Sequence, residues 1–250
     1  MNISLVIPIK QLQNAKQRLS GVLQPLERSA LFTAMIKDVL EVATICDRID
    51  EVVMVTEDVE VRELALQYSA RVMGEPDKLA VCASINEIED SKATESGLIA
   101  AVTHAGNQFA AADVDVMIFL PGDVPLVSVE ELEVVLDGIG LSSKPEVLIV
   151  PSSDLGGSNC LVCSPPNCLP FGFGKDSFRR HLRIARENNI DALVAKLPGI
   201  GLDVDTPEDL ISLSAEIKKS GIDNHTSRFL SDNDIFHRLS NFSKEEIVAI

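Results

Sequence analysis

The sequence predicts an α/β fold in which a mostly parallel β-sheet is covered by helices on both faces. Residues 116–120 form an unbroken apolar run, as expected for a strand buried on both sides of a parallel sheet. Similar apolar runs alternate along the chain with amphipathic helical segments, which is the order that βαβ units produce. Because 46% of the 250 residues are hydrophobic, the chain can bury a full core.

The first half of the chain shows this alternation from its start. Pro25 suits the first turn of a helix because its ring fixes a helical backbone angle. The patterns predict a strand over 3–9, a polar loop over 10–21, a helix over 25–45, a strand over 52–55, a helix over 59–68, a strand over 70–74, a loop with some helix over 75–93, and a helix from Thr94 to about Ala112.

The second half continues the same order after the central strand. Thr206, Pro207 and Asp209 have the spacing of a capping box with proline in the first turn, so a helix starts there. The other predicted elements are a helix over 128–138, a strand over 147–150, a loop of small residues over 152–159 ahead of a further strand, and a helix with Asp176 or Ser177 as its N-cap.

The chain turns polar after about residue 220. We therefore predict a main domain over residues 1–220 and a carboxyl-terminal appendage over 221–250, which holds short helices or is partly mobile.

Composition excludes several classes of partner. The formal net charge of −16 argues against general affinity for nucleic acid or anionic membranes. No apolar run approaches the ~20 residues of a membrane span, and the first ten residues lack the features of a signal peptide. We expect a cytoplasmic protein with reduced thiols. Cys160, Cys163 and Cys168 lack a second ligand pair at zinc spacing, which favours buried thiols over a zinc site.

The loop after the first strand carries three cations, Lys10, Lys16 and Arg18. A loop in this position of an α/β fold is a common place for the phosphates of a nucleotide. Cationic side chains there neutralise a triphosphate as point charges and as a planar fork. A solvated basic loop is the alternative, but a local cluster of cations in so acidic a chain favours anion binding.

Three carboxylates are candidate ligands for a divalent metal. Asp123 follows the central strand after a Pro-Gly turn, at the edge where open α/β sheets bind ligands. It could instead cap a turn or the helix that begins near Ser128. Asp203 and Asp205 are separated by one residue, so on an extended segment they point the same way and repel each other unless a cation lies between them. With Asp123 they make a plausible cradle for Mg²⁺.

A second set of candidates suits an anionic small molecule. Gly157 lets the backbone approach a ligand closely, and Ser158 and Asn159 offer hydrogen bonds. Gly174 and Ser177 precede or open a helix whose first turn is cationic, which also favours an anion. The alternatives are an ordinary turn and a solvated basic helix face.

Five of these segments, in this order, resemble one family. The chain is similar to the 2-phospho-L-lactate guanylyltransferases of coenzyme F420 biosynthesis, whose bacterial relatives use phosphoenolpyruvate. The resemblance covers about residues 1–215. It rests on residues 6–10 with 14–19, on 120–126 (Leu-Pro-Gly-Asp-Val-Pro-Leu), on 156–159 (Gly-Gly-Ser-Asn), on Phe173-Gly174 with Ser177-Phe178 and His181, and on 202–210 (Leu-Asp-Val-Asp-Thr-Pro-Glu-Asp-Leu).

The resemblance implies a nucleotidyltransferase fold of the glycosyltransferase-A type, as found in nucleotide-diphospho-sugar transferases. It implies that GMP passes from GTP to (2S)-2-phospholactate, giving lactyl-2-diphospho-5'-guanosine and diphosphate, with Mg²⁺ as cofactor. Ser158, Gly174 and Ser177 fall where family members contact the phosphorylated three-carbon acid. One position departs from the family pattern, because Ile99 stands where Asn usually follows Gly-Leu, which removes a polar contact to the nucleotide.

Other functions remain open at this point. Phosphoenolpyruvate could be the acceptor in the same reaction. A molybdenum-cofactor or sugar-phosphate nucleotidyltransferase would usually have a Gly-x-Gly first loop, and no glycine precedes Gly21 here. A nucleotide-binding regulatory module is the non-enzyme alternative, but it would be expected to lack the three metal-binding carboxylates. The acidic surface is compatible with a homodimer.

Overall fold

The computed structural model describes residues 1–76 and 90–240, with side chains from residue 97 onward in the second range. One seven-stranded sheet forms the centre, in the order β3-β2-β1-β4-β6-β5-β7. Its strands are β1 (Ile3–Pro8), β2 (Glu51–Val55), β3 (Arg71–Met73), β4 (Val116–Phe119), β5 (Glu146–Pro151), β6 (Ser158–Ser164) and β7 (Leu193–Val194).

The sheet is parallel except at β6. Strands β1, β2, β3 and β4 pair in parallel, as do β5 and β7, whereas β6 runs antiparallel to both β4 and β5. The small-residue loop between β5 and β6 makes a hairpin, which explains the reversal. The strand order reverses between β1 and β4, and in open α/β sheets ligands bind in the crevice at such a point.

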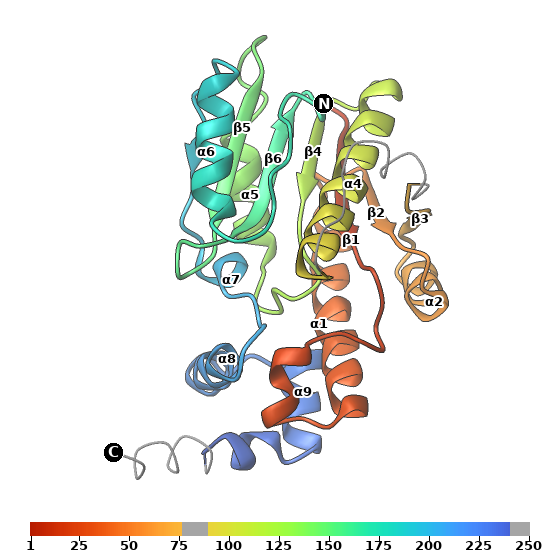
Figure 1. Ribbon diagram of the computed structural model, residues 1–250, viewed down its shortest axis with the longest axis vertical. Helices are drawn as coiled ribbons and strands as arrows, with labels where there is room; N and C mark the ends of the chain where they lie inside the picture. The colour runs from red at the N-terminus through yellow and green to blue at the C-terminus, as the bar shows by residue number, and fades with distance from the viewer. Residues whose placement is uncertain (77–89, 241–250) are drawn as a thin grey trace.

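The helices cover both faces of the sheet (Figure 1). Buried side chains of α1 and α5 pack on one face and those of α4 and α6 on the other. The helices are α1 (Pro25–Ile45), α2 (Val59–Gln67), α4 (Asp90–Ala111), α5 (Val129–Asp137), α6 (Ser177–Glu187), α7 (Pro198–Gly201), α8 (Pro207–Ser220) and α9 (His225–Asp232), with a 3-10 helix η1 (Gln17–Gly21) in the first loop.

A third apolar cluster lies beyond the carboxyl ends of the central strands. Figure 1 shows α8, α9 and the first turns of α1 below the sheet. Leu19 of η1 and Leu23, which follows it, share this cluster with Leu31 of α1, Leu213 of α8 and Leu230 of α9. The part of the predicted appendage that the structure describes thus packs on the main domain, whereas the division at residue 220 stays a prediction.

The predicted fold class is confirmed, and most elements begin and end close to their predicted positions. Gln24 and Glu27 form a capping box around Pro25, and Thr206 and Asp209 form the one predicted for α8. The helix predicted from Thr94 begins earlier, at Asp90, because the residues between are compatible with a helix. Most of the predicted loop over 75–93 lies outside the described residues. In the ranges 1–76 and 90–240, no helix is both long and apolar enough to cross a bilayer.

Candidate active site

Asp123 reaches the site from a tight turn after β4. An added Cβ on Gly122 would lie 2.5 Å from Ile9 Cδ1. A larger residue would therefore force either the buried Ile9 side chain or the turn itself to shift. The backbone carbonyl of Asp123 accepts a hydrogen bond from Val204 N at 3.1 Å, which ties this turn to the segment that carries the other two candidate carboxylates. Two parts of the chain that are far apart in sequence thus meet at the sheet edge.

Lys16 lies between two of the predicted metal ligands. Its ammonium donates to Asp123 Oδ2 and, at 2.7 Å, to Asp205 Oδ1. The side chain is only 5% exposed, and Nζ lies 5.2 Å from the centroid of the Phe32 ring. The backbone of Lys16 is left-handed, with φ 54°, which turns the side chain inward at the start of η1. Burial lowers the pKa of Lys16, but the two carboxylates outweigh it, so the pKa is raised and the group stays charged.

The two aspartates of the 203–205 segment have opposite environments. Burial raises the pKa of Asp203 to about 6, and the negative charges of Asp123 and Asp205 add to this effect. Burial would also raise the pKa of Asp205, but the charge and hydrogen bond of Lys16, with the charge of Arg18, lower it. The site therefore holds one carboxylate that is fully paired and one that resists ionisation.

The carboxylates are chemically suited to a divalent cation. Oδ1 of Asp123 is buried and has no hydrogen-bond partner among the described residues, and such an oxygen is costly unless a cation or water satisfies it. No group of three or more His, Cys, Asp or Glu in the described ranges is arranged to hold a metal. In this site the Lys16 ammonium lies between Asp123 and Asp205. The three residues fit Mg²⁺ by their chemistry, and the metal stays a prediction.

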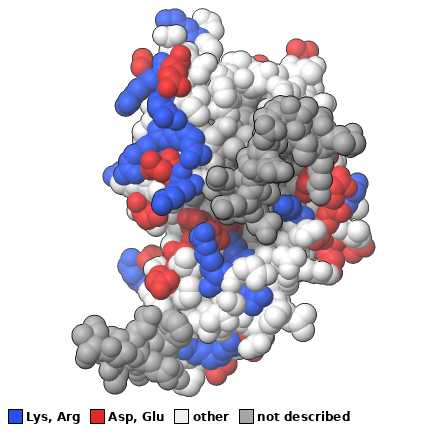
Figure 2. All heavy atoms as spheres, viewed as in Figure 1, with Lys and Arg blue, Asp and Glu red and all other residues white. Residues whose placement is uncertain are grey.

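The other two predicted cations, Arg18 and Lys10, make no direct contact with the three carboxylates among the described residues. Arg18 is exposed, and its charge acts on Asp205. Lys10 is exposed at the end of β1 and lines a separate pocket of about 550 Å³ with Glu57, Asp58 and Glu75. The structure thus brings Lys16 and Arg18 to the carboxylates but places Lys10 in the neighbouring pocket. Figure 2 shows basic and acidic side chains lying side by side where the sheet meets the helices below it.

The second predicted set of residues meets at the start of β6 and of α6. Ser158 N donates to Ser177 Oγ at 2.9 Å, and both serines are buried. Gly174 has a φ of 106°, a backbone conformation that favours glycine, and its carbonyl accepts from Ser177 N. The amide of Gly157 donates to Ser152 Oγ at 2.7 Å, so it is already used within the loop.

Asn159 connects the two sets. Its Nδ2 donates to Asp203 Oδ1 at 2.9 Å and to the carbonyl of Ile200 in α7 at 3.0 Å. Successive side chains of a strand point to opposite faces, so Ser158 faces α6 while Asn159 faces α7 and the carboxylates. Asn159 therefore orients Asp203, and its predicted contact with a substrate stays a prediction.

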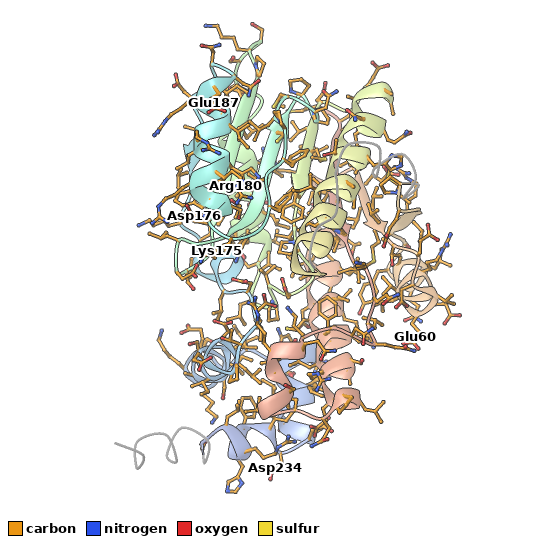
Figure 3. All side chains as sticks on the ribbon, viewed as in Figure 1. Glu60, Lys175, Asp176, Arg180, Glu187 and Asp234 are labelled. Atoms are coloured by element: carbon orange, nitrogen blue, oxygen red, sulfur yellow. The ribbon has the colours of Figure 1, made fainter. Side chains whose placement is uncertain are left out.

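Two contributors to the site were not predicted as site residues. His181 of α6 is fully buried and contacts Ser158 Oγ through Nδ1 at 2.9 Å. The sequence held a signal for it, because Ser177 and His181 are four residues apart and share a helix face. Arg180 donates to the carbonyls of Phe173 and Lys175 and so fixes the loop before α6, and Figure 3 shows Lys175, Asp176 and Arg180 together at that end of the helix.

Ile99 does not make a polar contact with the site. It packs, partly buried, against the core cluster between α4 and the sheet. The position where the family pattern usually has Asn is therefore filled by a core residue.

The sheet order and the site together define an α/β nucleotidyltransferase. The fold is shared with a solved structure from Desulfovibrio desulfuricans G20 described as a nucleotide-diphospho-sugar transferase, with a TM-score of 0.71 and 17% identity over 95% of this chain and 98% of that one. The family described as "Guanylyl transferase CofC like" matches residues 3–248. The chain belongs to this guanylyltransferase family, as its sequence motifs predicted.

Several curated relatives carry different acceptor names. A 3-phospho-D-glycerate guanylyltransferase of Colwellia psychrerythraea is 32% identical over 84% of this chain and 90% of its own length. A phosphoenolpyruvate guanylyltransferase of Roseiflexus sp. is 32% identical over 86% of both chains. A 2-phospho-L-lactate guanylyltransferase of Methanothermobacter thermautotrophicus is 28% identical over 92% of this chain and 90% of its own.

Proposed function

We propose that this chain transfers GMP from GTP to a phosphorylated three-carbon acid, with (2S)-2-phospholactate as the expected acceptor and phosphoenolpyruvate as the alternative. The observation that carries the proposal is that two sets of residues lie next to each other. In one set Lys16 contacts Asp123 and Asp205, and in the other Ser158 is paired with Ser177. Asn159, which follows Ser158, joins the second set to the carboxylates through its hydrogen bond to Asp203. One set of residues suits a triphosphate, the other suits a small acid, and they are adjacent. The names of the relatives support the substrate class.

The reaction needs charge neutralisation and alignment more than it needs a base. An oxygen of the acceptor's ionised phosphate attacks the α-phosphorus of GTP, the bond to the bridging oxygen of the β-phosphate breaks, and diphosphate leaves. The nucleophile is already an anion, so no proton has to be removed. Two polyanions must instead be held in line, which is the contribution of fixed cations and hydrogen-bond donors.

The residues of the site divide this work. Lys16 stays protonated because of its raised pKa, and with Arg18 it provides positive charge for the diphosphate that leaves. Mg²⁺, when bound, would be held by Asp123 with Asp203 or Asp205, and would supply positive charge that offsets the negative charge of the phosphates. Ser158 and Ser177 bind the acid through their hydroxyls. Lys10 lines the pocket that follows β2, and we propose that it contacts the nucleotide from there.

The test is to incubate the protein with Mg²⁺, one nucleoside triphosphate and one acid at a time, and to measure diphosphate release and product mass. The acids are 2-phospho-L-lactate, phosphoenolpyruvate and 3-phospho-D-glycerate. We expect release only when an acid is present, with GTP as the best donor. Equal release without any acid would indicate hydrolysis and would overturn the transferase proposal.

A binding measurement separates the enzyme from a regulatory module. We expect GTP to bind more tightly with Mg²⁺ than without it, and Asp123→Ala to abolish the difference. GTP binding that ignores Mg²⁺ in both proteins would favour the regulatory alternative. A cytoplasmic location and a homodimer remain predictions from the sequence.

A further inference from the structure

We infer that His181 is the positioning residue of the acceptor site, holding the Ser158 hydroxyl so that its proton is free to bind the acid; this rests on the proposed function of Ser158. His181 lies one helical turn into α6, between two partners from different segments. Its Nδ1 is 2.9 Å from Ser158 Oγ of β6, and its Nε2 is 2.9 Å from the backbone nitrogen of Gly172. It therefore joins the strand that carries Ser158 to the loop before α6.

The Gly172 contact fixes which ring nitrogen carries the proton. A backbone N–H can only donate, so Nε2 of His181 must accept and cannot be protonated. The proton of a neutral imidazole then resides on Nδ1, which donates to Ser158 Oγ. A second tautomer would place two donors, the Gly172 N–H and an Nε2–H, against each other. One backbone group thus decides the direction of the hydrogen bond at the serine.

The surroundings keep His181 neutral. The side chain is fully buried, and its ring meets the Phe173 ring edge to face at 5.0 Å between centroids. Burial, together with the positive charge of Arg180, lowers the pKa of His181 to about 4. Across the physiological range His181 therefore has one donor and one acceptor, both of them used, so it does not exchange protons with a substrate.

The consequence lies at the two serines. Ser158 Oγ accepts from His181, and Ser177 Oγ accepts from Ser158 N, so each hydroxyl already accepts one hydrogen bond from the protein. Among the described residues, neither hydroxyl donates its own proton to a protein acceptor. The O–H groups of Ser158 and Ser177 are thus directed away from the protein groups that donate to their oxygens. Oriented donors suit the phosphate or carboxylate of the acid, and orienting them before binding reduces the entropy cost of binding.

Two conservative variants separate this role from packing. Asparagine places its amide near the position of Nδ1, so His181→Asn can still donate to Ser158 but loses the Gly172 contact. Glutamine reaches the position of Nε2, so His181→Gln can accept from Gly172 but does not donate to Ser158. We expect His181→Gln to raise the KM of the acid about tenfold, the effect of one lost hydrogen bond, with the KM of GTP within about twofold. His181→Asn should recover most of that loss.

A double-mutant cycle shows whether His181 acts through Ser158. The acid used is whichever of the three phosphorylated acids the wild-type protein converts. If the inference is right, Ser158→Ala with His181→Gln is no worse in acid KM than Ser158→Ala alone. Three outcomes would overturn the inference in favour of a packing role. The losses from Ser158→Ala and His181→Gln could be additive, the acid KM could rise equally in His181→Asn and His181→Gln, or the KM of GTP could rise as much as that of the acid. An unchanged acid KM in Ser158→Ala alone would instead overturn the proposed acceptor site.

A measurement on the wild-type protein does not depend on the folding of any variant. The ¹⁵N chemical shifts of the imidazole distinguish a protonated Nδ1 from a protonated Nε2, and His181→Asn assigns the signal among the four histidines. We expect a protonated Nδ1 that persists at pH 5.5. A protonated Nε2, or a ring protonated on both nitrogens near neutral pH, would overturn the inference.

Discussion

Lys16 resolves an electrostatic problem at the centre of the site. Asp123 and Asp205 are both partly buried, in a chain whose net charge is already −16. Two like charges at one place would shift one pKa upward or force the turns apart. A buried ammonium with both carboxylates as partners offsets this repulsion, whereas removal of one member of such a group is costly because a charge remains unpaired.

The first prediction concerns this ammonium. Lys16→Met keeps much of the side-chain length but removes the charge, so we expect the free energy of unfolding to fall by about 3 kcal/mol in the absence of divalent ions. Mg²⁺ should then raise the melting temperature of the variant more than that of the wild type, because the ion replaces the lost charge. Thermal unfolding with and without Mg²⁺ measures both effects.

Lys10→Met is the matched control, since Lys10 is exposed and lies in the neighbouring pocket. It should leave the melting temperature and its response to Mg²⁺ close to those of the wild type. Equal behaviour of the two variants would mean that Lys16 does not screen the carboxylates.

The second prediction uses the raised pKa of Asp203. The folded value is about 6 against an ordinary value of 3.8, so the fold penalises the ionised form. That penalty is present in full above pH 6 and disappears below about pH 4. Asp203→Asn should therefore be more stable than the wild type at pH 7, by roughly 2–3 kcal/mol without divalent ions, and the difference should vanish near pH 4.

Denaturant unfolding at several pH values measures this difference. Asp191→Asn, an exposed carboxylate outside the site, should show no such dependence. A stability difference between Asp203→Asn and the wild type that is constant from pH 4 to pH 7 would contradict the pKa assigned to Asp203.

At the scale of the elements, the sequence predicted the helices and strands whose own residues show an apolar run or a capping pattern. Strand β4 is a continuous apolar run, β1 is apolar except for Ser4, and α8 has a complete capping box. Three of the described elements were missed, namely η1 with five residues, β7 with two and α7 with four, because none is long enough to show a period. The first turn of α7 is held from outside, since Glu131 of α5 accepts hydrogen bonds from Gly199 N and Ile200 N. Such a contact cannot be read from local sequence.

The third prediction belongs to α9, which is capped in a similar way. The carboxylate of Asp38 in α1 accepts from His225 N at 2.7 Å and from Thr226 N at 3.0 Å, and it is buried. Asp38→Asn replaces one acceptor by a donor against a helix N-terminus, so we expect a loss of about 1–3 kcal/mol and faster amide exchange in α9. Hydrogen exchange resolved by residue measures it.

Asp47→Asn provides the comparison, because Asp47 is exposed in the turn that follows α1. Its effect on stability should stay within about 0.5 kcal/mol. If exchange in α9 is as slow in Asp38→Asn as in Asp47→Asn, the cap does not hold the helix in place.

At the scale of the whole molecule, the site could be predicted as three segments but not as a set of contacts. The rule that ligands bind beyond the carboxyl ends of parallel strands brought Lys16 and Asp123 to one edge. The capping box fixed where α8 begins, directly after Asp205. The contacts of Asn159 with Asp203 and of His181 with Ser158 join residues 44 and 23 positions apart, and only the packed structure sets them. Charge and periodicity therefore located the site in the sequence. Side-chain packing in the folded structure determined which polar groups of the site already have a protein partner.

The last prediction concerns the cluster below the sheet, which connects the carboxyl-terminal helices to the basic loop. Leu230 of α9 is fully buried in a cluster that includes Leu19 of η1 and Leu23, which follows η1. Both leucines lie close to Lys16 in sequence. Arg238 adds an ion pair with Glu27 at 2.6 Å. Leu230→Ala leaves a cavity, so we expect a loss of about 2–5 kcal/mol in the free energy of unfolding. The KM of GTP should also rise in the protein that remains folded, because η1 loses part of its apolar support.

Ile222→Ala controls for a lost aliphatic side chain in the same region, because Ile222 is 36% exposed. Its cost should stay below about 1 kcal/mol, with the KM of GTP unchanged. Chemical unfolding and steady-state kinetics on the same preparations give both quantities. If Leu230→Ala were destabilised but kept the wild-type KM of GTP, α9 would support the fold without positioning the basic loop. If it were no less stable than Ile222→Ala, α9 would be a true appendage.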